Sequence, residues 1–296
     1  LQPTPDLVTP PISDPSTMQQ PTATATLLPP GPQNSDASNA GLIVFSMADG
    51  EYNHLFAYHP SYLPITRLTA DDWDDDSPAI SPDGTKIAFT SNRSGTYEVY
   101  ILDLLENSIS QITNIGAHVS SISWSNDGNY IAYDVYQNGH YDLIIQSTFD
   151  PNEAPIQLTD GNSNSFQPAW SPDGSQIAFV TDRSGRYEIW LVRLQNPEER
   201  FVKLVNDAEA DLTHPTWSPD GTWLAFSHHE PGDEVLILNT QQSDANPISI
   251  GKGSNPVWLP DGSGILVSLT LPNHTEIVAY SIADQHLVIQ IGRAHV

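Results

Sequence analysis

A four-residue turn motif, Ser-Pro-Asp-Gly, recurs along this chain at nearly even intervals. It occupies residues 81–84, 171–174 and 218–221, and degenerate copies occupy 125–128 (Ser-Asn-Asp-Gly) and 259–262 (Leu-Pro-Asp-Gly). The five aspartates lie 44, 46, 47 and 41 residues apart. A period in the forties is typical of a stacked or circular array of small structural units, so the repeat unit determines the fold.

Each unit divides into four short strands, a to d. Strand a ends in a large residue, and the turn motif follows it, with Pro presetting φ, Asp bonding nearby backbone and Gly accepting a positive φ. Strand b is a continuous apolar run such as Ile87-Ala88-Phe89, and strand c alternates, as in Tyr187-Glu188-Ile189-Trp190. Strand d closes the unit near Gln111-Ile112-Thr113. This pattern predicts an all-β protein, a β-propeller of four-stranded antiparallel blades.

The first unit, which begins at Gly41, has no strand a of its own, and five complete units follow it. We therefore expect six blades, with the closing inner strand missing at the C-terminus, where it should follow Gln290. Residues 40–290 form the predicted propeller, and residues 1–39, rich in Pro and Thr, form a predicted disordered linker. The chain starts at Leu1, so we expect that its true start is missing. Residues 291–296 interrupt the pattern, and their codons would match a sequencing adapter, so we expect them to be non-native.

Charge and cysteine content exclude several classes of function. The chain has 10 Lys plus Arg against 36 Asp plus Glu, a formal charge of −26, and no cysteine. A polyanion repels phosphate backbones and anionic lipid surfaces, so neither nucleic acid nor a membrane is an expected partner. The lack of cysteine excludes disulfides and thiol catalysis. No apolar run approaches the roughly 20 residues of a membrane-spanning helix.

The fourth unit contains "PAWSPDGSQIAFVTDRSGRYEIWLV", which resembles the repeat of TolB-type propellers. The resemblance covers Gly41 to about Gln290 and implies a six-bladed ring. Relatives of this kind include the propellers of prolyl-oligopeptidase-like and tricorn-like peptidases. We expect that the chain is not TolB itself, because TolB carries a small α/β domain where this chain has only the linker. The third unit also departs from the pattern, since it lacks the turn Pro and the Arg-Ser-Gly hairpin.

The strand order places the b–c hairpins and the d–a connections on one face of the ring. Variable polar loops on a rigid scaffold are the usual place for binding, whereas the repeated turns on the opposite face indicate a structural role. The predicted binding face comprises seven residues: Asp74, Asp76, Arg93, His118, Arg183, His214 and His228.

Each of these groups has a structural alternative. The acidic run 71–76 could bind Ca²⁺, but it lacks the D-x-D-x-D-G spacing, so a solvated loop is the favoured interpretation. Residues 228–230 with His214 could ligate zinc, but adjacent strand residues point to opposite faces, which disfavours that site. Arg93 and Arg183 recur at matched hairpin positions, which favours bonds within or between blades over ligand contacts.

Catalysis has little support in the sequence, because neither G-x-S-x-G nor H-E-x-x-H occurs. We predict no catalytic residues, cofactor or metal. The predicted function is a monomeric binding module for a protein or peptide, with a glycan as a further possibility, in an exported, periplasmic or cell-surface protein. Two alternatives stay open. One is the propeller of a peptidase whose catalytic domain is missing. The other is the outer sensor domain of a membrane receptor or kinase.

Overall fold

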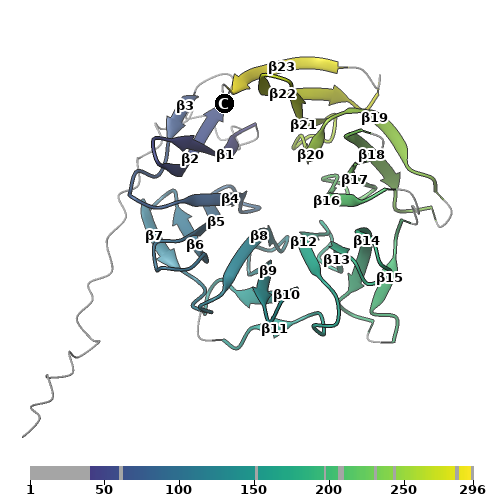
Figure 1. The fold of residues 1–296 in the computed structure, drawn as a ribbon, viewed down its shortest axis with the longest axis horizontal. Helices are drawn as coiled ribbons and strands as arrows, with labels where there is room; N and C mark the ends of the chain where they lie inside the picture. The colour runs from purple at the N-terminus through teal and green to yellow at the C-terminus, as the bar shows by residue number, and fades with distance from the viewer. Residues whose placement is uncertain are drawn as a thin grey trace, which may run out of the picture.

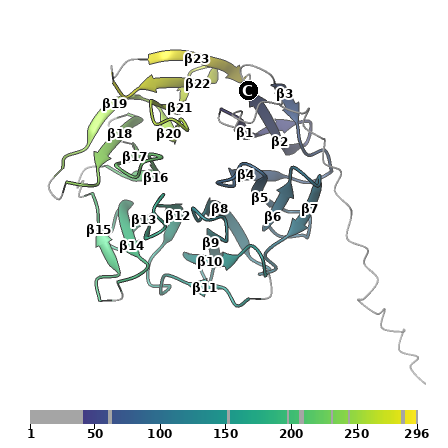
Figure 2. The same cartoon turned by 180° about the vertical axis from the view of Figure 1, so that it is seen from behind.

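The computed structural model describes residues 41–294, except 60–62, 151–152, 197, 206–209, 230–231, 243–244 and 284–286. The predicted disordered linker at residues 1–39 lies outside the described residues. Within these residues every regular element is a β-strand, and the strands form six antiparallel sheets. The sheets are arranged radially around a central axis, with β4, β8, β12, β16 and β20 nearest to it (Figures 1 and 2).

The blades follow one another along the chain. Blade 1 contains β1 (Ile43–Asp49), β2 (Tyr52–His59) and β3 (Leu63–Arg67), and blade 2 contains β4 (Asp75–Ile80), β5 (Lys86–Ser91), β6 (Glu98–Asp103) and β7 (Ser108–Gln111). Blade 3 contains β8 (His118–Trp124), β9 (Tyr130–Gln137), β10 (His140–Ser147) and β11 (Ile156–Gln157). Blade 4 contains β12 (Ser165–Trp170), β13 (Gln176–Thr181), β14 (Glu188–Arg193) and β15 (Phe201–Lys203). Blade 5 contains β16 (Leu212–Trp217), β17 (Trp223–His228), β18 (Glu234–Asn239) and β19 (Ile248–Lys252). Blade 6 contains β20 (Ser254–Trp258), β21 (Gly264–Leu271), β22 (His274–Ser281) and β23 (Leu287–Ala294).

This arrangement confirms the predicted six-bladed propeller. Five sheets have four strands in the order a, b, c, d, while blade 1 has three in the order β1-β2-β3. The strand β1 corresponds to strand b, so within the described residues blade 1 has no inner strand. Residues 291–294 continue β23, where Gly292 lies opposite Ile277. The expectation that residues 291–296 are non-native stays a prediction.

The repeated turn is held together by its own side chains. In the second blade, Ser81 donates its hydroxyl to Asp83 Oδ1 at 2.6 Å and accepts the backbone N–H of Lys86 at 2.9 Å. Asp83 Oδ1 also accepts the N–H of Thr85, and Gly84 has φ of 70°. These hydrogen bonds, with that from Ser81 as the largest cause, lower the pKa of Asp83. The turn is therefore structural, as its repetition predicted.

The hydrophobic core consists of five buried clusters, each between two consecutive blades. The large residue that ends strand a reaches across each of three junctions. The indole N–H groups of Trp124, Trp217 and Trp258 donate to strand-a carbonyls of the preceding blade at 2.9, 3.0 and 3.1 Å. Within the described residues, no such cluster joins blade 6 to blade 1.

Candidate functional site

The b–c hairpins and d–a connections meet at one end of the blades, which we call the hairpin face. On this face, side chains near the start of strand a form hydrogen bonds with the preceding blade. The N–H of Asn53 donates to Asp74 Oδ1 at 2.9 Å, and the Asn53 amide donates to Asp76 Oδ2 at 3.3 Å. Tyr141 donates its N–H to Asn164 Oδ1 at 3.1 Å in the same way. Asp74 and Asp76 therefore join blades 1 and 2.

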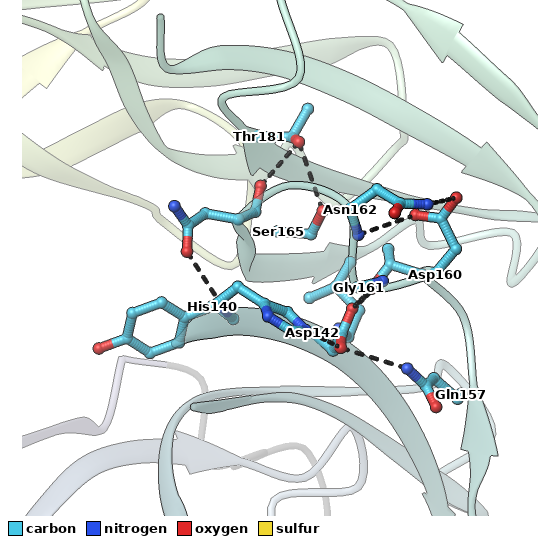
Figure 3. A network of polar contacts seen from close by, with 12 residues as sticks. His140, Asp142, Gln157, Asp160, Gly161, Asn162, Ser165 and Thr181 are labelled. Atoms are coloured by element: carbon cyan, nitrogen blue, oxygen red, sulfur yellow. Dashed lines mark hydrogen bonds and ion pairs between the residues drawn. The ribbon is translucent and has the colours of Figure 1, made fainter. Parts of the chain in front are cut away.

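The carboxylate of Asp142 lies near the start of strand c in blade 3. Asp142 accepts the hydroxyl of Thr159 at 2.6 Å, the N–H of Gly161 at 3.0 Å and the Gln157 amide at 3.2 Å, and it lies 3.0 Å from His140 Nε2 (Figure 3). The Thr159 oxygen also accepts a strand-c N–H at 3.0 Å. This carboxylate fixes the loop that follows strand d, and its oxygens are already engaged.

Arg93 is enclosed within blade 2. Its Nη2 lies 2.7 Å from Asp75 Oδ1, and the two side chains are 6% and 0% exposed. The guanidinium carbon lies 4.8, 5.2 and 5.3 Å from the ring centroids of Tyr100, Phe89 and Trp73. A buried ion pair inside a ring of aromatic side chains has a structural role. The pair lies within blade 2, which is one of the two arrangements, within or between blades, that the recurrence of this arginine favoured.

The predicted histidines lie apart in the structure. His118 begins β8, is exposed and contacts the Tyr97 ring edge-on at 4.9 Å. The backbone N–H of His214 donates to Gln167 Oε1 at 2.8 Å. Burial is the main cause that lowers the pKa of the His214 side chain to about 4. His228 ends β17 and is half-buried. Among the described residues, no three histidine, aspartate or glutamate side chains are grouped to hold a metal ion.

Six rings on the hairpin face form a feature that the sequence analysis missed, and we call it the aromatic arc. Ring centroids are 4.9 Å apart for Tyr97–His118 and Tyr136–Tyr141, 5.8 Å for Tyr141–Phe166 and 5.1 Å for Phe166–Tyr187. His118 and Tyr136 are partners in the β8–β9 register, so the two groups of rings adjoin and the arc runs from blade 2 to blade 4. Tyr136 and Tyr187 are 45% and 36% exposed. A signal existed in the sequence, since a Tyr followed by an acidic residue recurs at one matched position in these three blades.

Carboxylates surround the arc. The Tyr97 hydroxyl donates to Asp74 Oδ2 at 3.3 Å. Burial first, and then the carboxylates of Asp74 and Asp76, raise the pKa of Tyr97 to about 12. Burial and Asp134 also raise the pKa of Tyr141. Neutral aromatic faces beside negative charge favour cationic side chains over anionic ones.

The described residues line two grooves, one on each face of the ring. One of about 380 Å³ lies on the hairpin face between blades 5 and 6, lined by Asp233, Glu234, Lys252 and Leu269 among others. The larger, of about 620 Å³, lies on the opposite face between the turns of blades 2 and 3. Its lining includes Phe149, which is 72% exposed. Sequence reasoning gave that face a structural role alone and did not foresee this groove.

The model of the TolB β-propeller domain family matches residues 34–166 and 117–291. Among curated proteins, the TolB homolog of Chlorobaculum tepidum is 36% identical over 64 residues, which are 22% of this chain and 15% of that protein. The tricorn protease homolog 1 of Streptomyces coelicolor is 35% identical over 71 residues, 24% of this chain and 7% of that protein. The chain thus spans only a small part of the length of either relative.

Solved structures share the fold. TolB from Acinetobacter baumannii superposes with a TM-score of 0.73 at 19% identity, over 86% of this chain and 65% of that one. A puromycin-hydrolysing peptidase of Mycobacterium tuberculosis gives a TM-score of 0.61 at 15% identity, over 84% and 44%. At these identities the likeness concerns the fold alone. The described part of the chain contains no helix that is long and apolar enough to cross a membrane.

Proposed function

The chain belongs to the TolB β-propeller domain family, and from that premise we propose that it is a binding module for a cationic peptide segment of a partner protein. The observation that carries the proposal is the aromatic arc, whose exposed Tyr136 and Tyr187 lie on the face where the loops differ between blades. A Lys or Arg side chain over an exposed aromatic face contributes about 0.5–1 kcal/mol. The formal charge of −26 speeds the encounter with a cationic partner.

The proposal is one of binding without turnover. The Asp142 carboxylate on the hairpin face accepts hydrogen bonds from Thr159 and Gly161 that hold a loop, which supports a structural role for this group. We further propose that the module acts as a monomer in an exported protein, in the periplasm or at the cell surface. Family membership and the acidic composition support this location.

The test is a titration of the full chain with a fluorescent Lys- and Tyr-containing peptide and with a matched peptide in which Glu replaces Lys. We expect only the cationic peptide to bind, and its affinity to fall as salt rises, since exposed charge pairs are screened beyond about 8–10 Å. Tyr136→Ala and Tyr187→Ala should each weaken binding about two- to fivefold.

Phe149→Ala is the matched control, because it removes an exposed ring from the opposite face. It should leave the affinity unchanged. Weakening by Phe149→Ala with no effect of the two tyrosine variants would contradict the proposal, and so would turnover of the peptide by the chain alone.

A second candidate is the propeller of a peptidase, favoured by the 35% identity over 71 residues to the tricorn protease homolog 1. Reading the source locus would distinguish it, because a G-x-S-x-G hydrolase domain in the same frame supports the peptidase. A membrane helix encoded upstream would instead support the sensor domain of a receptor or kinase.

A further inference from the structure

Two hairpins of nearly identical sequence hold arginines in different surroundings. The first, Asn92-Arg93-Ser94-Gly95, has its counterpart in Asp182-Arg183-Ser184-Gly185. Arg93 has three stabilising neighbours: the Asp75 carboxylate at 2.7 Å, the Ser91 hydroxyl, which accepts its Nε–H at 2.9 Å, and the Trp73 ring at 5.3 Å. Blade 2 therefore supplies Arg93 with a carboxylate, a hydroxyl that accepts a hydrogen bond and a Trp ring that covers the guanidinium.

Blade 4 supplies neither the carboxylate nor the acceptor to Arg183, and its third ring is Phe201 rather than a Trp at the matched position. Ser165 stands where the first hairpin has its carboxylate, and Ser163 stands where it has the covering Trp. Thr181 stands at the position of the accepting hydroxyl, but its Oγ1 donates to the carbonyl of Asn164 at 2.7 Å (Figure 3). The Nε of Arg183 is buried without a hydrogen-bond partner, and no ion pair joins its guanidinium to the described residues.

Arg183 nevertheless keeps aromatic neighbours. Its guanidinium carbon lies 4.7 and 5.7 Å from the ring centroids of Trp190 and Phe179, which correspond to Tyr100 and Phe89 of blade 2, and 4.6 Å from that of Phe201. Burial lowers the pKa of Arg183, while Asp160 acts in the opposite sense. The Asp160 carboxylate is held by the N–H and side-chain amide of Asn162 at 3.4 and 2.9 Å rather than by the arginine (Figure 3). A fixed, aromatic-backed guanidinium without a bound carboxylate is the arrangement that binds one from a ligand.

We propose that Arg183 binds a carboxylate of the ligand, in the role that Asp75 has toward Arg93. This inference rests on the proposed function, because it assigns the carboxylate to the cationic peptide bound along the aromatic arc. Arg183 lies four residues before Tyr187 in the same hairpin, so one extended peptide reaches both. The ligand class is then a peptide with cationic residues and one carboxylate, from either its C-terminus or an Asp or Glu side chain.

The first experiment observes the arginine directly. In the full chain labelled with ¹⁵N, the Nε–H resonances of Arg183 and Arg93 are assigned with Arg183→Lys and then followed during titration with acetate and with acetamide. We expect a saturable shift of the Arg183 resonance with acetate alone, and no shift of Arg93, whose carboxylate partner is internal. An Arg183 resonance that does not respond to acetate overturns the proposal.

The second experiment compares one cationic peptide with a free C-terminal carboxylate, the same peptide amidated, and an amidated peptide with one internal Glu. We expect the carboxylate-bearing forms to bind about tenfold tighter than the amide. If only the peptide with the free C-terminus binds tighter than the amide, the ligand carboxylate is a C-terminus. If only the peptide with Glu does, it is a side chain. Equal affinities for all three overturn the carboxylate site while leaving the proposed function intact.

Ser165→Asp copies the arrangement of blade 2 into blade 4. It should remove the acetate response and the preference for carboxylate, yet keep the binding of the amidated peptide. Ser108→Asp, at an exposed position in β7, adds the same charge and should keep the preference. If Ser165→Asp retains the preference, the proposal is wrong. If no peptide binds but acetate still shifts Arg183, the peptide function fails and the carboxylate site stands.

Discussion

At the scale of single residues, Arg93 has a buried carboxylate partner, whereas Arg183 forms no ion pair with the described residues. The Asp75–Arg93 pair is almost wholly buried, and removing one partner of such a pair leaves an uncompensated charge. We predict that Asp75→Ser, which copies the residue of blade 4, lowers the free energy of unfolding by about 3–5 kcal/mol. Urea denaturation monitored by tryptophan fluorescence measures it.

Asp72→Ala is the control for this change, because Asp72 is an exposed acidic residue of the same loop. It should change the free energy of unfolding by no more than about 0.5 kcal/mol. Equal effects of the two substitutions would mean that the acidic run acts as one solvated loop, the interpretation favoured by the sequence for residues 71–76.

At the scale of strands and turns, successive units are joined by the residue that ends strand a. Trp217 is 8% exposed and donates to the preceding blade, whereas Trp170 donates to the carbonyl of Gly174 in its own turn at 3.3 Å and is half-buried. Trp217→Ala should therefore cost about 3–5 kcal/mol, as deletion of a buried ring does, and Trp170→Ala clearly less. Thermal and urea melts of both variants give the ranking, and the reverse order would contradict this account of the junctions.

The turn that follows Trp170 also differs from its counterparts in what lies beside its glycine. Elsewhere the Pro of one turn lies against the Gly of the next, as Pro172 does, with its Cδ 3.8 Å from a Cβ placed on Gly221. The third turn has Asn126 instead of Pro, and nothing lies within 4 Å of the same position on Gly174. The loss of one proline thus changes the packing of the following turn.

These particulars show what the sequence predicts well. Strands, turns and the inter-blade core were predictable because each repeats in a matched environment, so Ala88 and Ala178 are buried alike. The difference between Arg93 and Arg183 was not, because the two hairpins have nearly the same sequence, while the residue that decides the difference, Asp75 in blade 2 and Ser165 in blade 4, lies 18 residues upstream on the neighbouring strand. The aromatic arc was missed for a similar reason, since two of its four ring contacts, Tyr97–His118 and Tyr141–Phe166, join different blades.

At the scale of the whole molecule, buried clusters of the described residues fill five junctions between consecutive blades. Between blades 6 and 1 the described residues form no buried cluster, and β1 pairs with β2 alone. Phe45 on β1 is only half-buried, whereas its counterparts Phe89, Phe179 and Phe226 are fully buried. An unpaired edge of this kind pairs readily with another extended segment.

We predict that a peptide copying an inner strand of this chain, residues 253–259, binds the inner edge of β1 when added in excess. The expected results are a rise in the apparent Tm that grows with peptide concentration and slower hydrogen exchange within Ile43–Asp49. A scrambled peptide of the same composition is the control. Because an inner strand ends in a Trp that reaches the neighbouring blade, replacing that Trp by Ala in the peptide should weaken the effect. Protection that appears outside blades 1 and 6, or none at all, would mean that the open junction is not an acceptor for a strand.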